Sequence, residues 1–171
     1  MRIISAPLKI AFNKLDSANE MIFKGEFDRL SENNDDPISA WLRNIRSRGK
    51  SVDENEPIIQ LLVELHRKID ALSAHINNEK DEFLELDSNA ILESISHNLL
   101  IFNSDILETG EKYYARLEIA VFPIRKIPLF FYAKDSKNAE IYLIHSRDEV
   151  DFDNYIAARE RSLIREAKTR G

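Results

Sequence analysis

Cysteine is absent from the 171-residue sequence, and glycine is scarce. Without cysteine the chain forms neither disulfides nor thiolate metal sites, and this fits a reducing compartment, so we expect a cytoplasmic protein. The four glycines are Gly25, Gly49, Gly110 and Gly171, scattered along the chain. Because a phosphate-binding loop needs closely spaced glycines, this scatter argues against a glycine-rich nucleotide site.

Long apolar runs are also absent. The longest candidate, residues 127–133, has the length of a strand, whereas a bilayer-spanning helix needs about 18 or more apolar residues. The opening stretch MRIISAPLKIAF is interrupted by Pro7 and Lys9, and no small-residue cleavage site follows it. With 30 acidic and 24 basic residues the net charge is −6, which disfavours contact with nucleic-acid phosphates. We therefore expect no membrane insertion and no nucleic-acid partner.

Residues 1–55 are predicted to form an N-terminal helical segment. A polar stretch, residues 31–36, divides it, and a proline after an aspartate then marks the start of a second helix, residues 37–48. This second helix carries three arginines, Arg43, Arg46 and Arg48. The first, loosely amphipathic helix is suggested by Leu8, Phe12, Leu15, Met21 and Ile22.

The clearest pattern lies in residues 56–80, where apolar side chains recur at alternating steps of four and three residues. This spacing is the seam of a coiled coil and predicts a heptad oligomerisation helix. The chain would then form a homo-oligomer, from dimer to tetramer. A helix that faces the core of its own domain is the alternative, because the repeat is shorter than the three or four heptads that identify a coiled coil. The predicted assembly residues are Ile58, Leu62, Leu65, Ile69, Leu72 and Ile76.

The hydrophobic period changes to two in residues 81–147, which predicts short antiparallel strands joined by turns. Such a meander closes into a small barrel. The final residues, 148–171, begin with acidic and end with basic side chains, as the dipole of a helix favours. The predicted fold class is α+β: a small antiparallel β-barrel with N-terminal helices, a long heptad helix and a C-terminal helix. Strands are predicted over residues 112–121, 127–133, 141–145 and 99–101, with shorter ones near 83–86 and 90–95.

No set of residues suited to catalysis or metal binding emerges. His66 and His75 lie nine residues apart on one predicted helix, which places them on opposite faces. His97 and His145 are isolated in the β-segment. The acidic stretch DEVDFD lacks the glycine and glutamate of a calcium loop, and no GxSxG motif is present. We predict a non-catalytic protein without a metal or cofactor; a deep pocket with His97 or His145 beside a buried carboxylate would favour an enzyme instead.

The order of these parts, with the pieces ELHRKIDAL and SISHNLLIFNSDILETGEKYYARLEI, resembles diverged PilZ-type proteins that carry a tetramer-forming heptad helix. The resemblance covers residues 57–165. It implies a PilZ-like β-barrel and a setting in bacterial motility, attachment or second-messenger signalling. PilZ-type domains are known for binding cyclic di-GMP, so the resemblance also directs attention to the family's ligand motifs.

Those ligand motifs are only partly present. The first is Asp or Asn, any residue, Ser, two residues and Gly; here Ser94 replaces the acid or amide, Ser96 is retained, and Leu99 replaces the glycine. The second is a pair of arginines with three residues between them just before the barrel, whose guanidinium groups grip phosphate. No arginine lies between residues 68 and 115, and Arg43 and Arg48 have four residues between them.

These departures predict a non-catalytic, oligomeric signalling scaffold whose barrel binds a protein partner. The alternative is a genuine cyclic di-GMP receptor, in which Arg43, Arg46 and Arg48 supply the charge of the missing arginine pair.

Overall fold

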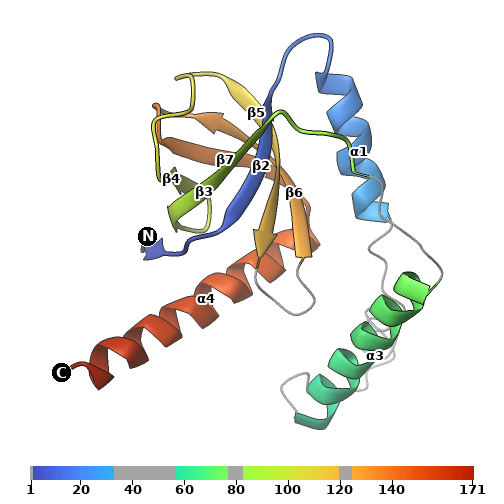
Figure 1. Ribbon diagram of the computed structural model, residues 1–171, viewed down its shortest axis with the longest axis vertical. Coiled ribbons are helices and arrows are strands. Elements are labelled where there is room, and N and C mark those ends of the chain that lie inside the picture. The colour runs from blue at the N-terminus through green and yellow to red at the C-terminus, as the bar shows by residue number, and fades with distance from the viewer. Residues whose placement is uncertain (1, 33–56, 77–82, 120–124) are drawn as a thin grey trace. The chain divides into compact units, whose positions relative to one another are not determined.

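The computed structural model describes residues 2–32, 57–76, 83–119 and 125–171 (Figure 1). The chain divides into two compact units. The first, called the barrel unit, combines residues 1–27 with residues 84–171, and the second, called the inserted unit, consists of residues 28–83. The barrel unit is therefore discontinuous in sequence.

The barrel unit is built on a seven-stranded antiparallel sheet. Six strands close into a barrel in the order β3-β2-β5-β6-β7-β4, because β4 pairs in turn with β3 (Figure 1). The short strand β1 extends the sheet along β3. The bounds are β1 (Ile4–Ser5), β2 (Lys9–Lys14), β3 (Ser88–Ile95), β4 (Leu99–Phe102), β5 (Lys112–Ile119), β6 (Arg125–Ala133) and β7 (Asn138–Ile144).

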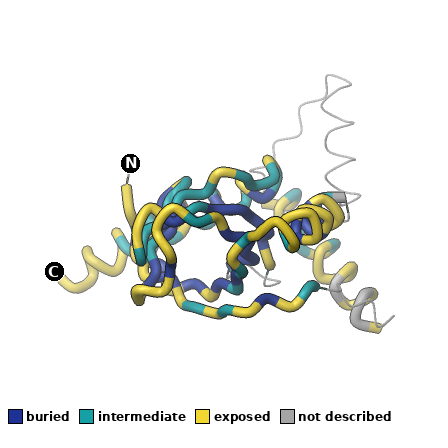
Figure 2. The backbone as a smooth tube through the Cα atoms, turned by 90° about the horizontal axis from the view of Figure 1, so that it is seen from above, coloured by how far each residue is buried: buried dark blue, intermediate teal, exposed yellow. Residues whose placement is uncertain are grey.

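Alternating side chains fill the interior of the barrel. In β2, Ile10 and Phe12 are buried while Lys9 is exposed. The rings of Tyr113 and Phe131, on the paired strands β5 and β6, stack with their centroids 5.1 Å apart. Figure 2 shows buried stretches of the backbone within the ring of the barrel and an exposed C-terminal end outside it. The apolar residues of a two-residue period thus form one contiguous core.

Helix α1 (Glu20–Glu32) covers part of the outer wall of the barrel with residues that belong to the barrel unit. Phe23 stacks on Tyr114 with ring centroids 5.1 Å apart, and Phe27 packs edge-on against Phe130 at 5.2 Å. Strand β5 is consequently buried on both faces over most of its length. A two-residue period usually leaves one face of a strand exposed, but here helix α1 covers that face.

Helix α4 (Ser146–Thr169) packs its first half against the barrel and leaves its end exposed (Figure 2). Phe152 and Ile156 are buried in the core. The Nε of Arg159 donates to the backbone oxygen of Ser5 at 3.2 Å, so α4 also lies along β1. This helix confirms the predicted C-terminal helix and begins two residues earlier.

Helix α3 (Pro57–Ile76) lies in the inserted unit and coincides with the predicted heptad segment. In the described ranges, no helix combines the length and the apolar character needed to cross a bilayer. The predicted helix over residues 37–48 lies outside the described residues.

The architecture confirms the predicted α+β class and the small antiparallel barrel. The predicted N-terminal helical segment, residues 1–55, is wrong at its start, because residues 4–5 and 9–14 are strands of the sheet. A barrel confined to residues 81–147 is wrong for the same reason. The pattern misled because β2 is short and its partner β3 follows only after the inserted unit. Residues 83–86 also form no strand.

Candidate functional site

The inserted unit exposes an apolar surface along α3, called the assembly face. Every residue of the predicted heptad seam is more than half exposed, whereas Ile59 and Val63, which lie off that seam, are partly buried. A stripe of large exposed apolar residues on one helix face is unusual for a protein that works alone. The assembly face comprises Ile58 (66%), Leu62 (53%), Leu65 (52%), Ile69 (56%), Leu72 (58%) and Ile76 (69%).

Within the described residues, the seam side chains are not packed into a core. Half-exposed leucine and isoleucine side chains lose little of their contact with water. The seam spacing brings the residues into one row, as knobs-into-holes packing between helices requires. In the described part of the chain, this row of apolar side chains is exposed.

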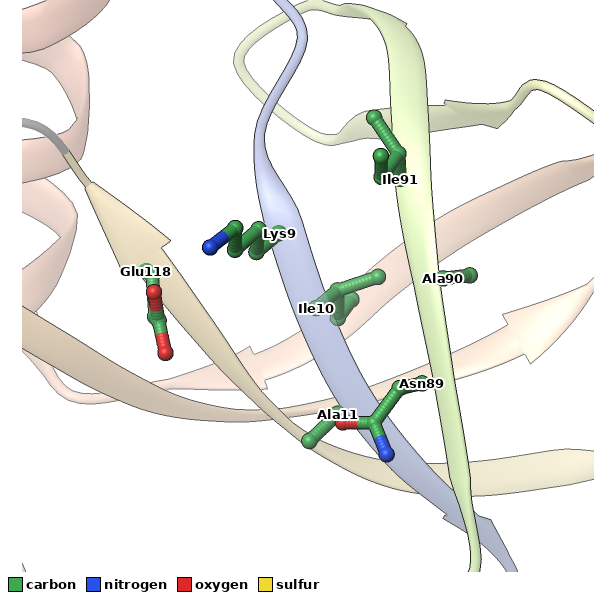
Figure 3. A pocket seen from close by; sticks show the side chains of 7 residues that line it. All are labelled: Lys9, Ile10, Ala11, Asn89, Ala90, Ile91 and Glu118. Carbon is green, nitrogen blue, oxygen red and sulfur yellow. The ribbon is translucent and has the colours of Figure 1, made fainter.

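The outer wall of the barrel has a shallow depression of about 290 Å³ over β3, β2 and β5 (Figure 3). Ala11 and Ile91 give it apolar surface, and Ile91 is 46% exposed. Lys9 and Glu118 contribute charges of opposite sign, and Asn89 contributes a carboxamide. The volume lies just below the roughly 300–1,000 Å³ of ordinary ligand pockets. This depression suits one or two side chains of a protein better than a dinucleotide.

A second depression, of about 570 Å³, lies where β2 leads into α1. Its walls are mostly polar, and Lys14 crosses it to form an ion pair with Glu108 at 2.6 Å. Asn13 Oδ1 accepts a hydrogen bond from Asp87 N at 2.9 Å in the same wall. These contacts tie loops together.

The two serines of the family motif lie at the junction of β3 and β4. Ser94 is a strand residue that pairs with Ser5 on one side and Ile101 on the other. Ser96 is fully buried, and its Oγ has no hydrogen-bond partner. Its backbone N donates to Leu99 O at 2.9 Å and closes the turn. The hydroxyl of Ser96 is therefore closed off from solvent, whereas Ser94 is partly exposed.

The charge expected beside that motif is not assembled among the described residues. Arg43, Arg46 and Arg48 lie outside them. Because the barrel begins at β1 and β2, the arginine pair of the family would stand in the segment before β2. That segment contains Arg2, but the position of the second arginine, four residues later, is occupied by Ala6. Arg2 forms an ion pair with Glu160 at 2.5 Å.

The histidines occupy structural positions. His97 Nδ1 lies 2.6 Å from Asp153 Oδ1, with both side chains largely exposed. His145 donates from Nε2 to the backbone oxygen of Phe27 at 2.8 Å and stacks on its ring at 3.7 Å. Within the described ranges no three His, Asp or Glu side chains converge as a metal site needs. Neither His97 nor His145 lines either depression.

Sequence reasoning missed a buried polar cluster on the outer wall. Glu26, Tyr114 and Arg116 are all buried beneath α1, and they are hydrogen-bonded to one another. Two signals were present: Glu26 stands at helical spacing between Phe23 and Phe27, and Arg116 interrupts an apolar strand. A charge on each of two otherwise apolar faces is the pattern of a buried ion pair.

The comparisons with known proteins leave the structure as the main guide to function. The sequence matches no family model, and neither a curated protein nor a solved structure gives a match.

Proposed function

We propose that this protein is a cytoplasmic, non-catalytic adaptor of PilZ-like type, in which the assembly face of α3 holds copies of the chain together and the barrel binds a protein partner. The exposed heptad row of six apolar residues carries this proposal. The resemblance to PilZ-type proteins suggests bacterial motility, attachment or second-messenger signalling as its setting.

The energetics of the assembly face favour another copy of the same helix. Full burial of one leucine or isoleucine side chain contributes roughly 1.5–3 kcal/mol, and these residues are about half exposed. The predicted a positions are Leu62, Ile69 and Ile76. The predicted d positions are Ile58, Leu65 and Leu72. A row of this kind complements itself, so a helix of the same sequence is a suitable occupant.

The proposed binding role of the barrel is supported by its closure and by the surface of its outer wall. The six-stranded ring is closed, so a partner would bind through side chains rather than by adding a strand to an open edge. The outer-wall depression offers apolar surface between Lys9 and Glu118, two charges of opposite sign. A peptide segment with an apolar anchor and polar flanks fits this chemistry.

The proposal is tested by placing charge on the assembly face. L65D together with I69D puts two carboxylates into the seam, and we expect the assembly to dissociate to monomers by light scattering. The matched control, Q60D with R67D, places two aspartates on exposed positions of the same helix away from the seam. A folded L65D/I69D protein that keeps the mass of the wild type would contradict the proposal.

A cyclic di-GMP receptor is the second candidate function, suggested by the resemblance, in which Ser96 of the ligand motif is retained although its side chain is buried. Calorimetric titration with cyclic di-GMP at physiological salt separates the two functions. Micromolar binding that disappears when Arg43, Arg46 and Arg48 are neutralised would establish the receptor. No heat and an unchanged melting temperature would leave the adaptor.

A further inference from the structure

The buried cluster on the outer wall, called the clasp, consists of Glu26, Tyr114, Arg116 and the backbone of Leu84. Glu26 Oε2 accepts from the Tyr114 hydroxyl at 2.6 Å and from Arg116 Nη1 at 2.8 Å. Glu26 Oε1 accepts from Leu84 N at 2.7 Å, and Arg116 Nη2 donates to Leu84 O at 2.6 Å. The three side chains are between 0% and 7% exposed. Each charged group in the clasp is thus satisfied by the others.

The position of the clasp in the chain is its most informative property. The barrel unit ends at Phe27, directly after Glu26, where the inserted unit begins. Leu84 is the first residue of the barrel unit after the inserted unit. The clasp therefore joins the two points at which the chain leaves and rejoins the barrel unit, and binds both to β5. Phe27 is held as well, since its backbone oxygen accepts from His145 and its ring stacks on the imidazole.

The hydrogen bonds of the clasp should form and break together. A buried ion pair that loses one partner leaves the other charge without compensation, so partial opening is unfavourable. Burial, followed by the Glu26 carboxylate, raises the pKa of the Tyr114 hydroxyl far above its ordinary value, so this group stays a donor at every physiological pH. The chain ends of the inserted unit are accordingly either both held or both released.

We propose that the clasp couples the folding of the inserted unit to that of the barrel, so that assembly through α3 stabilises the barrel. The β2–β3 pairing must close a long loop that contains the whole inserted unit, which opposes barrel formation. When the inserted unit is folded and held in an assembly, the clasp keeps its ends together and reduces that entropic penalty. The coupling to assembly rests on the proposed self-association; the coupling of folding does not.

Hydrogen-exchange mass spectrometry across a urea series tests this by following peptides from α3 and from β5 separately. In the wild type we expect one shared midpoint for both, rising with protein concentration. E26M with Y114F and R116M removes the polar side chains of the clasp together, so no charge is left unpaired. The urea midpoints of α3 and β5 should then differ. The midpoint of β5 should no longer depend on protein concentration.

Two further variants make the result decisive. I95V weakens the barrel core away from the clasp and should lower both midpoints together. If the triple variant does not fold, Y114F alone, which removes one hydrogen bond of the clasp, should separate the midpoints in the same direction.

Separate midpoints in an assembled wild type, or a clasp variant that behaves like I95V, would overturn the proposal. A wild type that is monomeric at every concentration would refute self-association alone. The clasp would then still require one shared midpoint, now independent of concentration.

Discussion

Arg125, the first residue of β6, forms an ion pair with Asp148 in the first turn of α4, and through it the helix is fixed to the barrel. The Asp148 side chain is 2% exposed, whereas that of Arg125 is 23% exposed. Arg125 also pairs with Asp151 on the next turn of the helix. One guanidinium thus holds two carboxylates of the acidic stretch that the sequence suggested only as a favourable helix start.

Replacing Arg125 with methionine should destabilise the barrel unit by about 3 kcal/mol, because Asp148 would be left buried without its partner. The free energy of unfolding in urea measures this. R125M combined with D148N should recover most of the loss, since both charges are then absent. A double variant as unstable as R125M would show that the methionine itself, rather than the stranded carboxylate, is responsible.

The same variant should change how stability depends on pH. Burial raises the pKa of Asp148 above its ordinary value of 3.8, with Arg125 opposing the shift. In R125M the pKa should rise further, so the folded state binds a proton more tightly than the unfolded state. The contribution of Asp148 to stability should be greatest below pH 3.8 and fall as pH rises through the folded-state pKa. Melting temperatures between about pH 3.5 and pH 7 would reveal this slope, and a D148N background should abolish it.

Glu140 on β7 predicts the opposite pH dependence. Its pKa is lowered below 4.5 by hydrogen bonds from Lys134 and from the Tyr132 hydroxyl. The stability that these contacts contribute is present above the unfolded-state value and lost as pH falls through the folded-state pKa. In E140Q the melting temperature should therefore depend less on pH in the acid range. The control E93Q, which replaces an exposed glutamate on β3, should leave that dependence unchanged. The same loss of melting temperature at acid pH in E140Q and in the wild type would contradict this.

Two glycines should respond to alanine in opposite directions. Gly110 has φ +83°, and an added Cβ there would meet nothing within 4 Å, so G110A suffers only backbone strain of about 1 kcal/mol. Gly25 lies inside α1 with equally open space around it, and G25A should stabilise the protein by about 1 kcal/mol through helix propensity. Urea unfolding of the two variants measures both changes, and a shared sign would contradict the assignment of backbone conformations.

The barrel unit should fold without the inserted segment. All seven strands lie outside residues 28–83, and Glu26 already bonds Leu84 N at 2.7 Å. Replacing residues 33–82 with a flexible linker of about ten residues should give a monomer that retains its tyrosine ellipticity and melts cooperatively. An unfolded product would mean that the barrel depends on the inserted unit for more than its chain ends.

The elements that sequence analysis predicted well are those whose pattern is local. The helix at residues 57–76 and the strands between residues 112 and 144 follow from patterns contained within a few turns or strands, and both kinds of element are present. Strand β2 was missed because Leu8 and Phe12, four residues apart, also satisfy helical spacing, and nothing nearby identified β3 as its partner.

The candidate surfaces were predictable to different degrees. The assembly face follows from spacing alone, and the structure adds that its residues are exposed. The outer-wall depression and the clasp each combine residues from both sides of the inserted unit, such as Lys9 with Glu118 and Glu26 with Arg116. Such combinations depend on the closure of the barrel, which no local pattern specifies.

The central claim, self-association through α3, is tested most directly by the mass of the wild-type protein in sedimentation equilibrium over a wide range of concentration. The account predicts a species of two to four chains of 19.8 kDa each, and its conversion to monomers by L65D with I69D. A mass of 19.8 kDa at every concentration would contradict it, and the exposed heptad row would then need another partner.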